Sequence, residues 1–177
     1  VNAGEHKEKS IVRLAGMITQ LKLLKTKKTG ETMAKFTLED LTGSINVCIF
    51  PKKYQMFGHV LANNSLVVIT GRVQISDFGD TEHYELQAEE AYGLFEALNH
   101  WGRSLVINLS SKILEDKNDL SGIKKLIDKE SGLCPVCFSA SAAGKRYFIE
   151  TDGRVSISDS LLKNVSGIAG NNSWKID

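Results

Sequence analysis

The chain has 177 residues, enough for one larger domain or two small ones, and 42% of them are hydrophobic, which excludes a disordered chain. Its formal net charge of +1 is close to neutral, so a nucleic-acid-binding surface would have to be local rather than chain-wide. No apolar run approaches the roughly 18 residues that a membrane-spanning helix needs.

In chain order, the first half is predicted as strands separated by short loops. Residues 1–10 are polar and do not begin with methionine, so we expect a linker within a longer protein. Patterns of period two predict strands at 10–24, 34–39, 44–50, 66–75 and 83–88, and apolar spacing predicts a helix at 52–61. Loops are expected at 25–31, 40–44 and 76–81. Gly16 lies inside the first strand, where glycine often marks a bulge or a bend.

The predicted hairpin over 34–50 has the clearest alternation. Its first strand places Ala34, Phe36 and Leu38 on one face and Lys35, Thr37 and Glu39 on the other. After the turn, Ile45, Val47 and Ile49 are expected in the core, opposite Ser44, Asn46, Cys48 and Phe50. The polar face offers groups that can contact a ligand, although a solvated strand face explains them equally well.

The order strand, strand, strand, helix, strand, strand is that of an OB-fold. This fold is a small five-stranded barrel whose second and third strands, with the neighbouring loops, commonly bind oligonucleotides. Strand count alone leaves a sandwich or another small barrel open. The OB-fold domain is expected over 11–93, followed by a connector at 94–103.

The second half is predicted as a small α+β domain at 104–177. Strands are expected at 104–109, 133–139, 146–150 and 155–157, and helices at 120–129 and 159–165. Ser158 or Asp159 is the expected N-cap of the last helix, Gly132 is expected to stop the earlier one, and 140–145 is interpreted as a turn. The fold class is therefore mainly β with α+β character, a five-stranded OB-fold barrel followed by a small α+β domain.

Lysines gather around the predicted first loop. On an OB-fold this loop borders the ligand groove, where lysines neutralise phosphates with salt-dependent, sequence-tolerant binding. Lysine-rich loops also occur on surfaces that bind nothing. The candidate nucleic-acid-binding residues are Lys22, Lys25, Lys27, Lys28, Lys35, Thr37, Asn46, Phe50, Arg72, Gln74 and Phe78.

Aromatic side chains are sparse near this groove. Single-strand binders usually stack bases on aromatic rings, at about 1–3 kcal/mol per base. Phe50, Phe78 and His83 are the candidates for stacking here. We therefore expect modest affinity, suited to a module tethered within a larger protein.

The three cysteines, an odd number without a secretory leader, predict reduced thiols and a cytoplasmic location. Cys134 and Cys137 form a Cys-x-x-Cys pair, but zinc needs about four ligands and Cys48 lies far away in the sequence. Residues three apart on a strand point to opposite faces, so the pair is interpreted as structural. No metal site and no cofactor are predicted.

No catalytic residue is predicted either. The adjacent carboxylates Glu39–Asp40 and Glu89–Glu90 diverge on a strand, whereas two-metal chemistry needs converging carboxylates. The histidines are scattered, and there is no phosphate-binding glycine loop. The segment Gln20–Leu24 resembles the short peptide that docks on bacterial sliding clamps, but it lies in a predicted strand and is interpreted as a coincidence.

The segment from Thr26 to Pro51 resembles the C-terminal region of the bacterial DNA polymerase III alpha subunit. The matching residues are Gly16, Thr26-Lys27-Lys28 with Gly30, Met33-Ala34, Phe36 to Gly43, Phe50-Pro51 and Gly71-Arg72-Val73. The Thr-Leu-Glu-Asp-x-Thr-Gly pattern is shared in weaker form with other OB-folds, including those of class II aminoacyl-tRNA synthetases. The second half resembles the same family's carboxy-terminal domain at 105–107, 120–126, Gly132 with Pro135-Val136, and 155–162.

This resemblance implies an OB-fold that contacts single-stranded template DNA and a terminal module that docks on the clamp-loader tau subunit. The polymerase's catalytic aspartates and its main clamp-binding segment would lie upstream. The chain is therefore expected to be catalytically silent, with the sliding clamp reached through the rest of the protein. Two alternatives stay open: an OB-fold that binds another subunit of a replication complex without DNA, and an anticodon-binding synthetase fragment, which the second half does not support.

Overall fold

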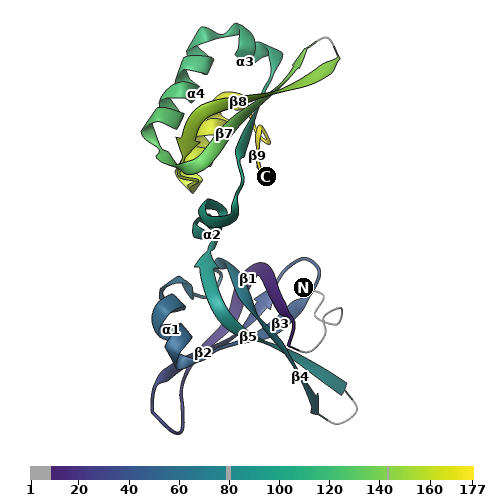
Figure 1. Cartoon of the computed structure of the whole chain (residues 1–177), viewed down its shortest axis with the longest axis vertical. Helices are drawn as coiled ribbons and strands as arrows, with labels where there is room; N and C mark the ends of the chain where they lie inside the picture. The colour runs from purple at the N-terminus through teal and green to yellow at the C-terminus, as the bar shows by residue number, and fades with distance from the viewer. Residues whose placement is uncertain (1–8, 79–80, 143) are drawn as a thin grey trace. The chain divides into compact units, whose positions relative to one another are not determined.

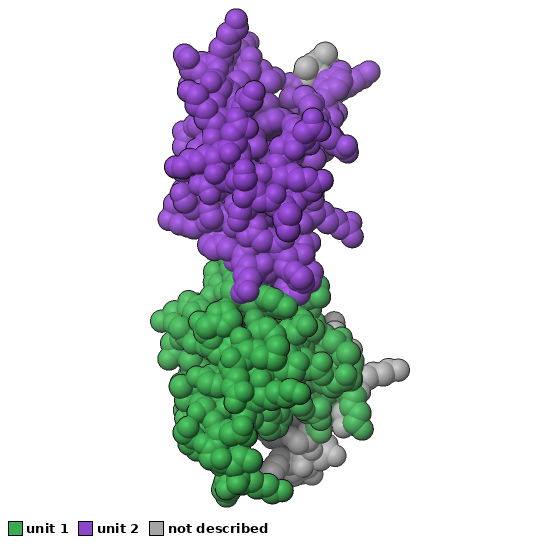
Figure 2. Space-filling model, turned by 60° about the vertical axis from the view of Figure 1, so that its left-hand side comes forward, with its two compact units in different colours: residues 1–94 green, residues 95–177 purple. Residues whose placement is uncertain are grey.

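The computed structural model describes residues 9–78, 81–142 and 144–177, without the side chains of 76–83 and of 142. It divides into two compact units, 1–94 and 95–177 (Figure 2). Each unit has a hydrophobic core of its own, as expected of separate domains. No helix in the described ranges is both long and apolar enough to cross a membrane.

The first unit is a closed barrel of five strands. They are β1 (Ile11–Lys25), β2 (Thr32–Glu39), β3 (Ser44–Ile49), β4 (Leu66–Phe78) and β5 (Thr81–Gly93). Their order around the barrel is β1-β2-β3-β5-β4, with β4 antiparallel to β1 and β3 parallel to β5 (Figure 1). Helix α1 (Pro51–Phe57) and the 3-10 turn η2 (Gly58–Val60) connect β3 to β4. This is an OB-fold, as the element order predicts.

The barrel interior is filled by the predicted alternate residues. Phe36, Leu38 and Val47 are each no more than 3% exposed. Cys48 corrects the predicted pattern, because it was expected on the polar face and is buried. It lies between Lys35 on β2 and Gln87 on β5, and two flanking strands suffice to cover so small a side chain.

Strand β1 changes partner at Met17, next to its glycine. It pairs with β4 from Ile11 to Met17 and with β2 from Met17 to Lys25. A Cβ on Gly16 would lie 2.6 Å from the carbonyl oxygen of Glu39, so a side chain there would force the strands apart. The irregularity of β1 lies further along the strand, between Thr19 and Lys22, and the pairing with β4 is regular at Gly16.

The β4–β5 hairpin is longer than predicted. Residues 76–78 continue β4, and β5 begins at Thr81, so most of the loop expected at 76–81 is strand. The backbone pairing continues to Phe78 opposite Thr81. The hydrogen bonds between strands use main-chain groups, so the pairing can continue into a polar segment. Such a segment has no apolar alternation from which the strand could be predicted.

The second unit contains a four-stranded sheet and four helices within the described ranges. Its elements are α2 (Leu94–Trp101), β6 (Leu105–Leu109), α3 (Ser111–Glu115), α4 (Lys117–Lys129), β7 (Ser131–Ala142), β8 (Lys145–Val155), α5 (Asp159–Ala169) and β9 (Trp174–Ile176). The sheet order is β8-β7-β6-β9, in which β6 and β7 are parallel and the other pairs antiparallel. Helices α4 and α5 contact each other and share one core with the sheet.

Helix α2 occupies the segment predicted as a connector. It is helical because Phe95 and Leu98 lie on one face and pack against the second core. Asn99 fixes the helix to the unit: its Oδ1 accepts from the Ile157 N–H at 2.7 Å, and its Nδ2 donates to the Ile157 carbonyl at 2.8 Å.

Other boundaries in the second unit also differ from the predicted ones. The α3 helix and β9 were not predicted, and strand β8 runs on through the segment between 150 and 155. The expected turn at 140–145 is narrower, because β7 reaches Ala142 and β8 begins at Lys145. Gly132 lies in β7, beyond the end of α4 at Lys129. The N-cap prediction is confirmed at Ser158, whose Oγ accepts from the Leu161 N–H at 3.1 Å.

Candidate nucleic-acid interface

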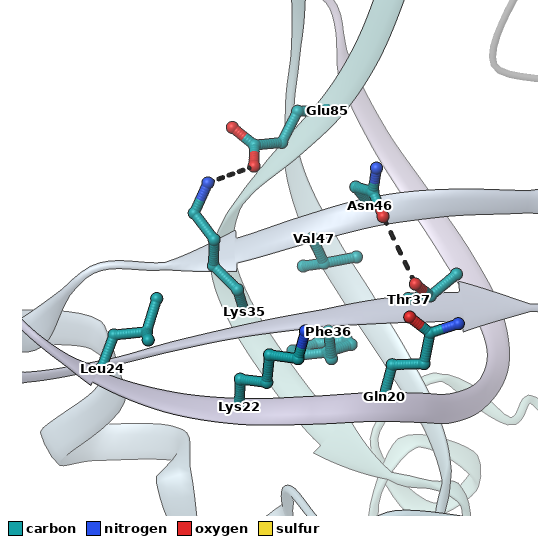
Figure 3. A pocket seen from close by; sticks show the side chains of 9 residues that line it. All are labelled: Gln20, Lys22, Leu24, Lys35, Phe36, Thr37, Asn46, Val47 and Glu85. Carbon is teal, nitrogen blue, oxygen red and sulfur yellow. Dashed lines mark hydrogen bonds and ion pairs between the residues drawn. The ribbon is translucent and has the colours of Figure 1, made fainter.

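A pocket opens on the outer face of the barrel, across β1, β2, β3 and β5. Its volume is about 270 Å³, and it is lined by Gln20, Lys22, Leu24, Lys35, Phe36, Thr37, Asn46, Val47 and Glu85 (Figure 3). Strand alternation places Lys35 and Thr37 on this outer face, because Phe36 and Leu38 point into the barrel. Asn46 lies directly opposite Thr37 on β3.

A bulge in β1 brings Lys22 to the same face. The register moves from Thr19 opposite Thr37 to Lys22 opposite Lys35, which is three steps on β1 for two on β2. Gln20 lies in this bulge with a φ of 53°, an uncommon conformation for a residue other than glycine. The Leu21 N–H donates to Asn63 Oδ1 at 2.9 Å, which satisfies a backbone group within the bulge. Without the extra residue, alternation from Ile18 would aim Lys22 into the core.

Polar contacts cross the pocket between strands. Lys35 Nζ donates to Glu85 Oε1 at 2.9 Å, and their side chains are 47% and 39% exposed. This hydrogen bond to Glu85 raises the pKa of Lys35. Thr37 Oγ1 donates to Asn46 Oδ1 at 3.3 Å, and Figure 3 shows the Asn46 amide nitrogen turned away from that bond.

The charge of the pocket is positive but partly neutralised. Two ammonium groups, on Lys22 and Lys35, are accompanied by one carboxylate, on Glu85. Burial and the nearby Glu85 carboxylate raise the pKa of the Cys48 thiol, so this thiol is held in its neutral form. The arrangement can therefore attract a polyanion, and it contains no activated nucleophile.

The pocket includes four of the predicted binding residues: Lys22, Lys35, Thr37 and Asn46. Of the other predicted lysines, Lys25 is the last residue of β1, and Lys27 and Lys28 are exposed on the loop between β1 and β2. Lys25 Nζ donates to Thr32 Oγ1 at 2.8 Å. The loop is closed by a hydrogen bond from the Thr26 N–H to the Glu31 carbonyl at 2.9 Å.

Three other predicted residues with described side chains, Phe50, Arg72 and Gln74, do not line the pocket. Phe50 is 46% exposed and precedes α1. Arg72 Nε donates to Glu89 Oε1 at 2.7 Å. Gln74 on β4 lies opposite Glu85 on β5. The side chains of Phe78 and His83, the other stacking candidates, lie outside the described residues.

Gln20, Leu24 and Glu85 line the pocket but were not predicted as binding residues, and the pocket also includes Phe36 and Val47, which were expected in the core. A signal for the first two exists in the sequence, since apolar positions change phase from Val12, Leu14 and Ile18 to Leu21 and Leu23. No comparable signal exists for Glu85, because its place opposite Asn46 follows from the parallel pairing of β3 with β5.

Cys134 and Cys137 both lie on β7. Cys134 is buried and Cys137 is partly exposed, and burial raises the pKa of the Cys134 thiol. Among the described residues, no group of three or more His, Cys, Asp or Glu side chains is placed to hold a metal ion. The segment Gln20–Leu24, which resembles a clamp-binding peptide, lies within β1.

Residues 12–92 match a family described as "OB-fold nucleic acid binding domain". The first unit is an OB-fold by both topology and sequence. The match begins one residue into β1 and ends one residue before the end of β5, so it covers the barrel and its pocket.

Nearly the whole chain is similar to the alpha subunit of DNA polymerase III. It is 25% identical over 170 residues to the protein of Escherichia coli O157:H7, and 26% over 166 residues to that of Halalkalibacterium halodurans. Both matches cover 94% of this chain and 14% of the relative. The Pseudomonas aeruginosa protein is 28% identical over 152 residues, covering 85% of this chain. The chain thus spans about 14% of the length of these curated relatives, and the similarity supports a nucleic-acid-binding OB module.

Solved structures of single-stranded DNA-binding proteins also resemble part of the chain. Yeast mitochondrial Rim1 is matched at a TM-score of 0.40 and 12% identity, over 49% of this chain and 97% of that one. Mycobacterium smegmatis SSBb is matched at 0.42 and 15%, over 48% and 86%.

Proposed function

We propose that the OB-fold unit contacts single-stranded DNA as an accessory, non-catalytic part of a DNA polymerase III alpha-type protein. The observation that carries this proposal is the pocket that brings Lys22 and Lys35 beside Thr37 and Asn46 on one face. Ammonium groups neutralise phosphates, while hydroxyl and amide groups suit sugars and base edges. Similarity to a replicative polymerase supports DNA as the ligand, and a replication role implies a cytoplasmic location.

Base stacking is not provided by the described side chains of the pocket. Among them Phe36 is the aromatic one, and it is 3% exposed, so it offers no face to a base. Phe50 has an exposed ring but lies outside the pocket. Binding should therefore be mainly electrostatic, tolerant of sequence and strongly dependent on salt.

Anisotropy of a labelled oligothymidylate, titrated with the 177-residue chain at several NaCl concentrations, tests the proposal. Each lysine–phosphate contact to a single strand adds about 0.7 to the slope of log K against log salt. The double variant Lys22→Ala/Lys35→Ala should therefore lower the slope by about 1.4 and weaken binding more than about tenfold near 50 mM NaCl.

The matched control is Lys112→Ala/Lys125→Ala, which removes two exposed lysines of the second unit. It should bind like the unmodified chain. Absence of binding, or an equal loss in both double variants, would refute the proposed DNA contact. The variant Lys27→Ala/Lys28→Ala separately measures what the first loop adds, and a preference for an RNA strand of equal length would favour the anticodon-type alternative.

A second candidate is an OB-fold that binds a protein subunit and no DNA. It is favoured by the Lys35–Glu85 ion pair, which occupies one of the two pocket lysines. Under this alternative the chain binds no oligonucleotide at low salt, yet mutation of the pocket still weakens its association with another replication protein.

We also propose that the second unit docks the clamp-loader tau subunit. Support comes from the similarity to alpha subunits, which extends over 94% of the chain and therefore includes this unit. Purified tau should bind the immobilised chain, and it should bind the Lys22→Ala/Lys35→Ala variant equally well. No binding of tau would reject the docking role while leaving the DNA contact standing. Any contact with the sliding clamp would come from the rest of such a protein.

A further inference from the structure

Strand β8 forms an outer edge of the second sheet. It is the first strand in the order β8-β7-β6-β9, so within the described residues its outer backbone groups pair with no strand (Figure 1). Tyr147, Phe148 and Ile149 follow one another on this edge and are 49%, 62% and 49% exposed. Successive strand residues point to opposite faces, so the edge is apolar on both sides. Long apolar edges of this kind readily pair with another chain.

The charges that flank this apolar segment are arranged in order along the strand. Lys145 and Arg146 precede it, Glu150 and Asp152 follow it, and all four side chains are exposed. In an antiparallel pair of identical strands, the basic end of one copy therefore lies opposite the acidic end of the other. A strand from an unrelated protein would not require this mirrored order.

We propose that β8 pairs antiparallel with β8 of a second copy of this chain, about a twofold axis at Phe148. In this register the two Phe148 side chains lie opposite each other. Tyr147 lies opposite the partner's Ile149, and Arg146 lies opposite the partner's Glu150, each of these pairs occurring twice. The two sheets then form one continuous sheet, and both apolar edges are covered.

The sequence distinguishes this register from its neighbours. An axis at Tyr147 would place Arg146 opposite the partner's Phe148, and an axis at Ile149 would place Phe148 opposite the partner's Glu150. Both alternatives set a charge against an aromatic ring, and the axis at Tyr147 also loses the ion pairs, whereas the axis at Ile149 would still set Arg146 opposite the partner's Asp152. Register is strongly specified where apolar and charged pairs agree in this way.

Sedimentation equilibrium of the 177-residue chain without DNA measures the proposed dimer. The chain should dimerise at micromolar concentration, and Phe148→Arg should make it monomeric by opposing two arginines across the axis. The matched control is Leu133→Arg on β7, which replaces a side chain that is 81% exposed and should leave the dimer intact. Circular dichroism establishes that each variant is folded.

A charge exchange tests the register itself. Arg146→Glu alone or Glu150→Arg alone opposes like charges twice, and each should weaken dimerisation by about tenfold. The double variant Arg146→Glu/Glu150→Arg restores both ion pairs and should return affinity to within about threefold of the unmodified chain. These variants keep the apolar segment, so they decide the question even if Phe148→Arg is unfolded. A chain that stays monomeric, a dimer that survives Phe148→Arg in folded form, or a double variant that stays as weak as the single ones overturns the proposal.

Discussion

Replacing Glu85 by glutamine should tighten the binding of single-stranded DNA, although Glu85 lines the pocket. Its Oε1 lies 2.9 Å from Lys35 Nζ, so a phosphate that approaches Lys35 must compete with this carboxylate. A glutamine side chain at this position would keep the shape and a weaker hydrogen bond but would remove the charge. The substitution therefore frees Lys35 and removes a repulsive group at the same time.

The expected size of this effect follows from two contributions. An exposed ion pair is worth about 0.2–1 kcal/mol, and this pair is 47% and 39% exposed. A carboxylate about 6 Å from a phosphate repels it by about 0.7 kcal/mol in a water-like dielectric, and by more near a protein surface. Together these contributions reach about 1–2 kcal/mol, which corresponds to binding about 5- to 30-fold tighter.

Oligothymidylate anisotropy at low salt measures this change directly. The control is Asp159→Asn, which makes the same change in net charge by breaking the Lys163–Asp159 ion pair of 2.6 Å in the second unit. The control should bind as the unmodified chain does. If Glu85→Gln binds no more tightly, or if Asp159→Asn gains as much, the competition for Lys35 is not what limits affinity.

Further predictions concern stability and thiol chemistry. Asn99→Ala leaves the Ile157 N–H and carbonyl without their side-chain partner and should destabilise the second unit by about 1–3 kcal/mol in urea unfolding. Gly16→Ala should destabilise the first unit by more than about 1 kcal/mol, since its Cβ would meet a carbonyl oxygen at 2.6 Å; an unchanged midpoint would contradict the close approach. Cys137 should react first with a thiol reagent at pH 8. The two buried thiols, whose pKa values are raised, should react only at higher pH or after unfolding, and rapid reaction of all three would show that the burial is wrong.

Local pattern predicted much of the first unit. The alternation at 34–39 and 45–49 identified the core face of the hairpin, apart from Cys48, whereas the bulge of β1 lies between Thr19 and Lys22 and not at Gly16. Elements that depend on distant partners were harder to predict. Strand β9 has three residues and exists by pairing with β6, and helix α2 is held by Ile157 far along the chain.

The candidate site shows the same division between local and distant information. Lys35, Thr37 and Asn46 follow from alternation within one hairpin. Lys22 reaches them through a bulge, which shifts the pattern by one residue, and Glu85 reaches them through a parallel pairing that no nearby residue reveals. Sequence therefore identified the cations of the pocket and missed its carboxylate.

The parallel pairing of β3 with β5 also has a consequence for motion. It is short, joining Asn46–Cys48 to Glu85–Gln87, and it connects segments far apart in the chain. Bringing such segments together has an entropic cost that few hydrogen bonds offset. We therefore expect this short β3–β5 pairing, here called the seam, to form late in folding and to separate before the other strand pairs of the barrel. The pocket lies across the seam, since Asn46 and Glu85 come from its two sides. A strand of DNA bound there would contact both β3 and β5 and stabilise their pairing. The amide protons of the seam would then exchange more slowly when DNA is bound.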